Sequence, residues 1–421
     1  MYLTTRKRRG TVIILVAVCL MAIMGFVAIA IDGGLLQHNK RTAQATADAA
    51  ALAAGAELYA NFQTGQGLDT SGTAATKALA VASANGFTND LVNSKVTVNI
   101  PPLSGMHEGM AGYAEVLVEW YQARGFSAIW GSGNITVNAR AVAIGQWTPF
   151  RDGILALNPT LPGSLSANGG GAVNVVNADV IVDSNSSTAI TSTGGGKITA
   201  PNFYITGTPG TSLSGGATII GNVVNNQPPT PDPLAYLPAP DPSTMTVQSN
   251  HATTISSNQT TYLQPGVYTG GIHVSGQATL NMAPGIYYMD GGGFSFTGQG
   301  NLAAAGVMVY TAPKSTSDVI NVNGTGQVNF TPPTTGPYSG IALWQERTST
   351  NTIALTGNGT SSLYGTIYGQ HALLNATGNG TQDVIGSQYI SYDVSLGGNG
   401  NFNISWQQNL TARTRLIYLV E

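Results

Sequence analysis

The stretch LTGNGTSSLYGTIYG, residues 355–369, sets the pattern for most of this chain. ATGNGTQDVIGSQYI (376–390) and LGGNGNFNISW (396–406) repeat its order of glycine, asparagine and short apolar runs, with starts 21 and 20 residues apart. An earlier pair, VSGQATLNMAPGIYYM from Val274 and FTGQGNLAAAGVMVY from Phe296, is offset by 22 residues. A recurring period near 21 residues indicates a stacked structural repeat.

The glycines of these repeats fit the corners of a coil. In a stacked coil, apolar strand residues point inward onto the equivalent residues of the next turn, and Gly or Asn occupies the corners that need a positive φ. The triplets GGG at 169–171, 194–196 and 291–293 suit such corners, and no G-x-x-x-x-G-K-[ST] phosphate loop occurs. We therefore predict a parallel β-helix (solenoid) over residues 151–421.

Three segments depart from the period. Residues 226–245, NQPPTPDPLAYLPAPDPSTM, are rich in proline, which cannot donate to a β-ladder, and are predicted to form an extended excursion on the solenoid surface. Residues 331–353 lengthen one turn. The segment RTRLIYLVE, residues 413–421, is predicted to be a closing strand that covers the last coil, as terminal repeats require.

The bulk composition limits the functions to consider. The 421 residues include 54 Gly and 20 Pro, and 8% of them are charged, about a third of the usual share. Residues 151–421 hold six Lys and Arg against eleven acids, and no basic patch follows residue 41, so no nucleic-acid partner is expected. Cys19 is the one cysteine, which excludes an intrachain disulfide and a cysteine-based zinc site.

Near the N-terminus, VIILVAVCLMAIMGFVAIAI (Val12–Ile31) holds twenty consecutive residues without a charge, about the number that spans a bilayer core. A secretory signal peptide has a shorter apolar core and a small-residue cleavage motif, whereas this run meets Asp32 and continues as helix. The run predicts a transmembrane helix at 11–31, with the lipid bilayer as its partner.

The charges beside this helix predict its orientation. Four basic residues precede it at 6–9, against Lys40 and Arg41 after it. The positive-inside bias therefore places the basic tip, residues 1–10, in the cytoplasm, and the chain from residue 33 onward outside it.

Between the apolar run and the solenoid we predict a small α+β domain over residues 32–150. Its first part, AQATADAAALAAGAEL (43–58), is alanine-dense and therefore helical, although it lacks a wide stripe of large apolar side chains. A second helix is predicted at 71–87, ended by Asn85-Gly86. Alternating apolar and polar residues then predict three strands, at 95–100, 113–123 and 134–147.

The segment RRGTVIILVAVCLMAIMGFVAIAIDGGLLQHNKRTAQATADAAALAAGAEL (residues 8–58) resembles the N-terminal segment of the TadG-like proteins of the Flp/Tad (tight adherence) pilus system. The matched features are the basic residues with Gly10, the apolar span, AIDGG with Asp32, and QATADAAALAAGA. ARAVA (139–143) and the glycine-rich segment from Leu263 are similar more loosely. The resemblance implies a non-catalytic, membrane-anchored component of pilus assembly, with pilin-like and platform proteins of the apparatus as partners.

Two departures from related proteins affect this interpretation. Pilins of this class are cleaved after a glycine that is followed by Glu at the fifth position, but Leu15 is the fifth residue after Gly10, so we predict that the chain keeps its N-terminus. Many relatives end in a von Willebrand A-like domain with a DxSxS metal motif. That motif does not occur in this sequence, and the predicted β-helix stands in its place.

The resemblance also bears on two local features. The alanine-rich helix is expected to pack closely, either within its own domain or on neighbouring pilin-like helices. Asp32 at the membrane edge would either pair with a cation, such as Lys40 or Arg41 of a neighbouring chain, or remain solvated.

Parallel β-helices include polysaccharide lyases and hydrolases, so catalysis has to be considered. Asp179 and Asp183 in ADVIVDS fall on the same face of a strand and are the best candidates, with Lys197 as the one base nearby. Other acids are scattered without a repeated motif, namely Asp290, Asp318, Asp383 and Asp393. We predict no catalytic residues and no enzyme.

Metal and cofactor sites are not predicted either. His251, His273 and His371 are isolated, without H-x-x-x-H or H-E-x-x-H spacing. Asn-x-Ser/Thr sequons at Asn323, Asn358 and Asn379 sit in Asn-Gly turns and are interpreted as turn residues.

Aromatic residues of the solenoid leave two alternatives open. They would either form an exposed strip that binds cell-surface polysaccharide or stack inside the coil; they are Tyr268, Tyr287, Tyr288, Trp344 and Tyr364. We predict a mainly β, single-pass protein of the bacterial inner membrane that assembles or anchors Flp-type pili. The alternative is a membrane-tethered surface β-helix that binds or cleaves polysaccharide.

Overall fold

The computed structural model describes residues 11–129, 131–358, 361–380 and 383–421; the basic tip expected at 1–10 lies outside these residues. The chain divides into two compact units. Unit 1 holds residues up to Trp147 together with Arg415–Glu421, and unit 2 holds Thr148–Thr414. The first division falls close to the boundary expected near residue 150.

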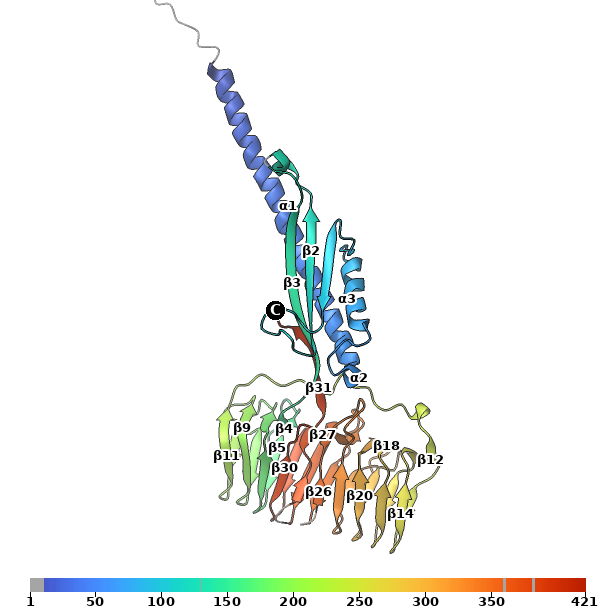
Figure 1. Cartoon of the computed structure of the whole chain (residues 1–421). Helices are drawn as coiled ribbons and strands as arrows, with labels where there is room; N and C mark the ends of the chain where they lie inside the picture. The colour runs from blue at the N-terminus through green and yellow to red at the C-terminus, as the bar shows by residue number, and fades with distance from the viewer. Residues whose placement is uncertain (1–10, 130, 359–360, 381–382) are drawn as a thin grey trace, which may run out of the picture. The chain divides into compact units, whose positions relative to one another are not determined.

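Unit 1 is built on one unbroken helix, α1 (Thr11–Ala60), of 50 residues (Figure 1). The apolar run and the alanine-rich stretch are therefore two parts of the same helix, as the high helix propensity of alanine predicts. A short helix, α2 (Phe62–Gly65), follows, and then α3 (Thr73–Ala84). The α3 helix ends at Ala84, followed by Asn85 as its cap and Gly86 at φ +91°, where the sequence predicted its stop.

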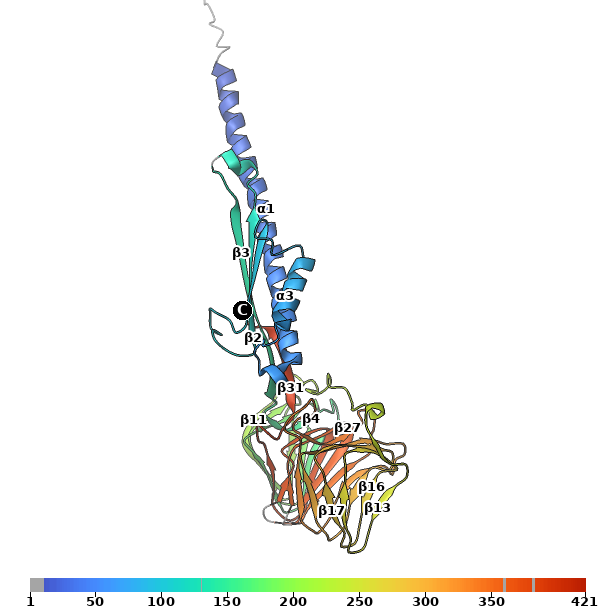
Figure 2. The same cartoon turned by 45° about the vertical axis from the view of Figure 1, so that its right-hand side comes forward.

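The three alternating segments form strands β1 (Ser94–Asn99), β2 (Tyr113–Gln122) and β3 (Ile135–Pro149), paired antiparallel in that order. A single 3-10 turn, η1 (Phe126–Ile129), lies between β2 and β3. Figure 2 shows this sheet beside α1 and α3.

The fourth strand of the sheet is β31 (Arg413–Leu419), which was predicted as a strand but not as part of this sheet. It lies beside β3, where the Val142 backbone N–H donates to the Glu421 carbonyl at 3.0 Å and the Val420 N–H donates to the Val142 carbonyl at 2.8 Å. The expectation that 413–421 caps the last coil is therefore wrong, and so is the extension of the solenoid to residue 421. Residues 415–421 return to unit 1, so the solenoid is an insertion between two strands of the smaller unit.

Alanine packs on alanine in the core of unit 1. One face of α1 is buried against the sheet, and the small residues of both elements are fully covered: Ala43, Ala47, Ala50, Ala51 and Ala54 on the helix, and Ala114, Ala139, Ala141 and Ala143 on the strands. Small side chains on both surfaces allow the two backbones to approach closely. Of the two expected packing modes, the structure therefore contains packing within the helix's own unit.

Unit 2 is a parallel β-solenoid of about 11 turns. The strands of its first stretch are β4 (Asp152–Ala156), β5 (Leu165–Asn168), β6 (Ala172–Val176), β7 (Asp179–Val182), β8 (Ile190–Thr193), β9 (Lys197–Ile205), β10 (Thr211–Leu213) and β11 (Thr218–Val224). A 3-10 turn, η2 (Pro242–Thr244), precedes the second stretch.

The strands of the second stretch are β12 (Val247–Ser249), β13 (Thr253–Ile255), β14 (Thr260–Leu263), β15 (Gly266–Thr269), β16 (Ile272–Val274), β17 (Thr279–Met282), β18 (Gly285–Asp290), β19 (Phe294–Phe296), β20 (Leu302–Ala305), β21 (Val307–Ala312), β22 (Ile320–Val322), β23 (Val328–Thr331), β24 (Ile341–Gln345), β25 (Ile353–Gly357), β26 (Ser361–Leu363), β27 (Thr366–Gly378), β28 (Asp383–Ile385), β29 (Gln388–Gly397) and β30 (Phe402–Ser405).

The sequence repeats match the strand register. Leu355 pairs with Ala376, Ala376 pairs with Leu396, and Val274 pairs with Phe296, so each quoted repeat is one turn of the coil. Inward-facing apolar residues of successive turns form one continuous buried core. The glycine triplets lie at corners, with positive φ at Gly169, at Gly194 and Gly195, and throughout 291–293.

The order of the coils differs from their order in the sequence. The chain enters the solenoid at β4, which pairs with β29 on one side and β7 on the other. It runs outward to β11, starts again at β12, and coils back until β29 and β30 meet β4, β5 and β6. The green, red, orange and yellow bands of Figure 1 follow this order along the row of strands.

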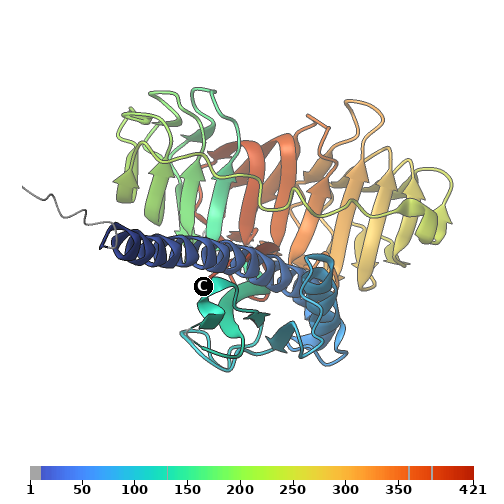
Figure 3. The same cartoon turned by 90° about the horizontal axis from the view of Figure 1, so that it is seen from above.

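The proline-rich segment 226–245 makes this order possible because it connects the two ends of the solenoid. It runs along the length of the coils as an extended strand-free connector (Figure 3). The predicted surface excursion is confirmed, but the segment is also packed: Leu234 and Leu237 are 1% and 4% exposed in a cluster with Tyr310, Trp344 and Tyr368.

Candidate functional site

The first half of α1 presents an uncovered apolar surface. Between Val12 and Ile31, the large apolar side chains are 47–75% exposed. Among the described residues, α1 is the one helix whose length and composition would let it cross a bilayer. Ala28 is the exception within this surface, since it is 4% exposed.

Asp32, the first charged residue after the apolar surface, holds η1 against the helix. Its carboxylate accepts the backbone N–H of Phe126 at 3.2 Å and that of Ser127 at 2.6 Å. Gly125 approaches so closely that a Cβ there would lie 2.6 Å from the Asp32 Oδ1 atom. Asp32 is thus not simply solvated, because it binds a turn of its own unit. Its pairing with a cation of a neighbouring chain stays a prediction.

Further polar contacts attach the strands along α1. The Asn39 amide donates to the Gln122 Oε1 atom at 2.7 Å, at the end of β2. Lys40 donates to the carbonyl of Asn138, and Gln44 donates to the carbonyl of Arg140 at 2.8 Å. The polar residues that directly follow the apolar run of α1 therefore bind the sheet, and the alanine-rich part of the helix packs on the sheet further along the chain.

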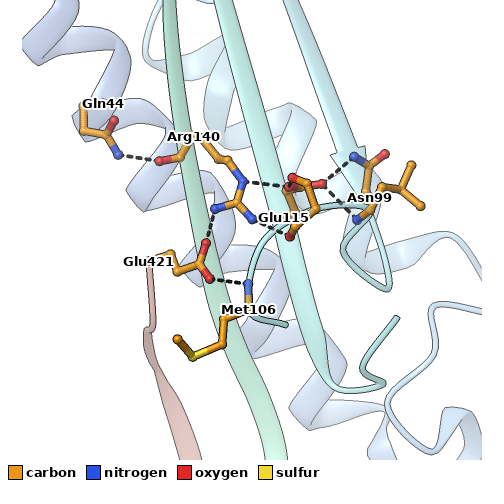
Figure 4. Close-up of polar contacts among 8 residues, drawn as sticks. Gln44, Asn99, Met106, Glu115, Arg140 and Glu421 are labelled. Carbon is orange, nitrogen blue, oxygen red and sulfur yellow. Dashed lines mark hydrogen bonds and ion pairs between the residues drawn. The ribbon is translucent and has the colours of Figure 1, made fainter. Parts of the chain in front are cut away.

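On the other face of the sheet, a buried ion pair organises the loop between β1 and β2 (Figure 4). The Arg140 Nε atom donates to the Glu115 Oε1 atom at 2.7 Å, and the Glu115 side chain is fully buried. Arg140 also forms an ion pair with Glu421, on the chain that follows β31. Burial opposes ionisation of Glu115, but hydrogen bonds from Ser104, Asn99 and Arg140 lower its pKa to about 2.

The same network fixes the backbone of this loop. Glu115 accepts the Leu103 N–H at 3.1 Å, Glu421 accepts the Met106 N–H at 3.1 Å, and Arg140 donates to the Ser104 carbonyl at 2.7 Å. Sequence reasoning missed this network. The pattern that could have indicated this network is a Glu in β2 and an Arg in β3, both on the face of the sheet opposite the alanines.

The candidate catalytic acids of the solenoid are not brought together. Asp179 accepts the Asn202 amide at 2.9 Å, whereas Asp183, which is 4% exposed, accepts the backbone N–H of Thr230 from the connector at 2.8 Å. Lys197 is exposed and lies in a different ladder of strands from Asp179. These residues therefore do not form an acid–base cluster.

Asp152 is the neighbour of Asp179 that the sequence did not reveal. The two residues are paired in register on the adjacent strands β4 and β7. Burial, and then the charge of Asp179, raise the pKa of Asp152 to about 7. Burial also raises the pKa of Asp183 to about 6, against the opposing hydrogen bond from Thr230.

The other acids and histidines each have local contacts. Asp290 pairs with Lys314 at 2.8 Å, Asp318 accepts three bonds from Lys314 and Ser315, Asp383 accepts the Ser361 N–H, and Asp393 accepts the Asn158 amide. His273 contacts the Gly270 carbonyl and His371 the Arg347 carbonyl, while His251 is exposed. Within the described residues no group of three His, Cys, Asp or Glu could hold a metal ion.

Tyr268 and Tyr287 stack inside the coil, whereas Trp344 and Tyr288 lie in the cluster beneath the connector. Tyr268, Tyr287 and Trp344 are at most 2% exposed, and the rings of Tyr268 and Tyr287 stack at 5.8 Å. Tyr288 is partly buried and stacks on Tyr310 at 5.0 Å. Tyr364 is also partly buried. The exposed strip is therefore wrong for Tyr268, Tyr287 and Trp344, and it stays a prediction for Tyr288 and Tyr364.

Arg347 uses this aromatic cluster to clamp the connector. Its guanidinium lies 5.0 Å from the Trp344 ring centroid, and its Nη2 atom donates to the carbonyls of Leu234 and Leu237, both at 2.7 Å. Its Nε atom donates to the Tyr368 hydroxyl, which in turn donates to Asp232. One cation thus satisfies buried carbonyls of a segment that has no strand partner.

Beside this clamp, a surface hollow of about 330 Å³ lies between the connector and the coils. Asp183, Asp232, His371 and Tyr392 are among its lining residues. In this hollow, two acids that lie far apart in the sequence meet an imidazole and an aromatic ring.

These features define a class of protein: a long apolar helix that continues as the core of a small α/β unit, into which a β-solenoid is inserted. Residues 10–57 match the family model described as Putative Flp pilus-assembly TadE/G-like. The N-terminal segment is thus a TadE/G-like domain, which supports a role in pilus assembly. No curated protein and no solved structure is detectably similar to the chain.

Proposed function

We propose that this protein is a non-catalytic, membrane-anchored component of Flp/Tad-type pilus assembly in the bacterial inner membrane. In this proposal the apolar half of α1 spans the bilayer with the N-terminus in the cytoplasm, and both units lie outside. Pilin-like and platform proteins of the apparatus are the partners, and the solenoid acts as a scaffold.

One observation carries this proposal. The family match over residues 10–57 covers both halves of α1, the exposed apolar half and the half that forms the core of unit 1. An exposed surface of this size is unfavourable in water, at roughly 25 cal/mol per Å² of apolar area. A bilayer removes that cost, and the twenty apolar residues suffice to cross it.

The absence of catalysis is supported by the roles of the acids in the solenoid. Asp179 and Asp183 accept hydrogen bonds from different partners, the Asn202 amide and the Thr230 backbone N–H. The polar groups of unit 1 likewise attach strands and loops to one another. These arrangements suit a rigid scaffold.

The experiment is a gene deletion, with Flp-type pili counted by electron microscopy. Complementation with the wild-type gene should restore pili, and complementation with Leu20→Arg/Met24→Arg should not, because each arginine in the span costs about 3 kcal/mol of insertion energy. The variant Leu20→Ala/Met24→Ala is the matched control and should restore pili. Normal pili in the deletion strain would exclude the assembly role.

The hollow beside the connector favours a second candidate, a membrane-tethered β-helix that binds or cleaves polysaccharide. Carboxylates, an imidazole and an aromatic ring can together bind a sugar. Incubation of the purified protein with envelope polysaccharides tests this candidate, with glycan binding and new reducing ends as readouts. Asp183→Asn/Asp232→Asn should abolish either readout if the hollow is the site.

A further inference from the structure

We infer that the turn Gly125–Ile129 is a second membrane contact, which lies in the interfacial layer of the bilayer with Phe126 turned toward lipid. The inference rests on the proposed membrane anchoring of α1 and adds to it a partner for a segment that the sequence analysis did not single out. The partner is a phospholipid surface on the extracytoplasmic side.

Position is the first argument. Asp32 directly follows the apolar run, and it accepts the N–H groups of Phe126 and Ser127. Ala28 lies one turn earlier on the same helical face, about 6 Å closer to the centre of the span. Ala28 is 4% exposed, whereas its neighbour Ile29 is 67% exposed.

We attribute the covering of Ala28 to the packing of η1 on α1. In both Figure 1 and Figure 2 this turn lies against α1 beyond the end of β2, and the two elements are in contact. The turn therefore overlaps the last turn of the apolar run instead of staying above it. If residues 12–31 cross the hydrocarbon core, η1 lies at the core boundary.

The chemistry of the segment suits this depth. Phe126 is 49% exposed, and no charged residue occurs between Arg124 and Arg140. An aromatic ring and an arginine at the edge of a span are typical of the interface, where the ring sits among headgroups and the cation reaches phosphate. In water, the exposed part of the Phe126 side chain would gain no hydrophobic stabilisation.

The turn is also held rigidly enough to act as a contact. Two hydrogen bonds to Asp32 and the close approach of Gly125 fix it to α1, and the bond from Asn39 to Gln122 fixes the strand that leads into it. A helix alone rotates and tilts freely in a bilayer. A rigid second contact beside the helix restricts both motions, and so sets how unit 1 stands on the membrane.

Unit 1 also offers a matched control. Met106 is 81% exposed and lies in the loop before β2, whereas η1 follows the end of β2. The ten residues of β2 separate the two positions by roughly 30 Å. Met106 is thus an equally apolar side chain that should remain in water.

The experiment places one cysteine at a time in the full chain, in a Cys19→Ser background, and labels it with an environment-sensitive fluorophore. The sites are Ile29→Cys in the span, Phe126→Cys in the turn and Met106→Cys in the distal loop. The protein is reconstituted into phosphatidylcholine and phosphatidylglycerol vesicles, with and without brominated acyl chains. We expect bromine quenching at 29 and 126 and none at 106.

A second arm tests the attachment by Asp32. Asp32→Asn keeps the span but weakens two charge-assisted hydrogen bonds, so quenching at 126 should decrease while quenching at 29 persists. If the protein that keeps Asp32 shows quenching at 29 but none at 126, the inference is overturned, and the proposed anchoring of α1 still holds. Failure of the protein to float with vesicles, with no quenching at 29, would overturn the proposed anchoring itself.

Discussion

Gly145 of β3 lies against Gly55 of α1, so close that a Cβ added to Gly145 would be 1.8 Å from the Gly55 carbonyl oxygen. No side chain can be accommodated at that distance without separating the helix from the sheet. The contact explains why the alanine-rich part of α1 needs no large apolar residues. At this point the backbone of the helix itself meets the strand, and small alanine side chains fill the rest of the contact.

Gly145→Ala should therefore destabilise unit 1 by about 1–3 kcal/mol or more, the usual range for overpacking. Hydrogen exchange of the α1 amides, measured in detergent, should report faster exchange in residues 43–58. Gly33→Ala is the control, since nothing lies within 4 Å of a Cβ at that position. Equal exchange in the two variants would contradict the close contact.

Ala50→Leu/Ala54→Leu should have a similar effect for a different reason. Both alanines are fully buried, so the added atoms must displace the sheet. Ala45→Leu/Ala60→Leu adds the same volume at exposed positions of the same helix and should leave the thermal midpoint almost unchanged. Equal thermal midpoints for the two double variants would show that α1 does not pack tightly on the strands.

Removal of the Arg140 side chain should leave Glu115 buried without its cation. Arg140→Met is expected to cost about 1–3 kcal/mol, the range for a buried acceptor that loses one donor, because Arg140 is 28% exposed and Asn99, Leu103 and Ser104 still donate to Glu115. Proteolysis of the 101–112 loop should become faster, because Arg140 also holds the Ser104 carbonyl. Lys95→Met, which breaks the exposed pair with Glu119, is the control and should cost far less.

Glu115 also predicts a pH dependence. Its folded-state pKa of about 2 lies below the ordinary 4.5, so the unfolded chain takes up the proton first as the pH falls. The contribution of Glu115 is thus complete above pH 4.5 and is lost between there and pH 2. Glu115→Gln should lower the free energy of unfolding at pH 7. It should also reduce the loss of stability in this acid range, as measured by unfolding at a series of pH values.

Asp152 should behave in the opposite way. Its pKa is raised to about 7 from 3.8, so the folded state holds the proton more tightly, and the stability of the solenoid falls as pH rises between these values. Asp152→Asn should therefore stabilise the solenoid at pH 8 and differ little from wild type near pH 4. Asp290→Asn, which breaks the exposed pair with Lys314, should give no gain at pH 8.

Arg347→Met should release the connector. Without the guanidinium, the carbonyls of Leu234 and Leu237 lose their donors, and the segment has no strand partner to replace them. Limited proteolysis should then cut within 226–245 faster than in the wild-type protein, while the coils remain uncut. Arg151→Met removes an exposed arginine with one weak contact and should give the wild-type pattern.

The local elements could be predicted because their signals are local. Helix propensity predicts the alanine-rich part of α1, alternation predicts β1, β2 and β3, and the glycine-punctuated period predicts the register of Leu355 with Ala376 and Leu396. Each of these patterns lies within a few dozen residues. The TadE/G-like segment likewise lies in one continuous stretch.

The long-range arrangement could not be predicted in this way. Residues 413–421 read as a strand, but nothing local says that its partner is β3 rather than the last coil. The pairing of β29 with β4 joins residues more than two hundred positions apart, and a period alone does not give the order of the coils. The role of Asp32 was missed because its partners, Phe126 and Ser127, are backbone groups that no side-chain motif marks.

The insertion of the solenoid has a consequence for the order in which the protein is made. Because β31 is synthesised after every coil, the sheet of unit 1 stays one strand short, and Arg140 lacks Glu421, until the whole solenoid has been made. The edge of β3 is therefore open for as long as the coils are being synthesised. Unit 1 thus acquires its final sheet only after unit 2 has been made, so the unit that begins first in the sequence is completed last.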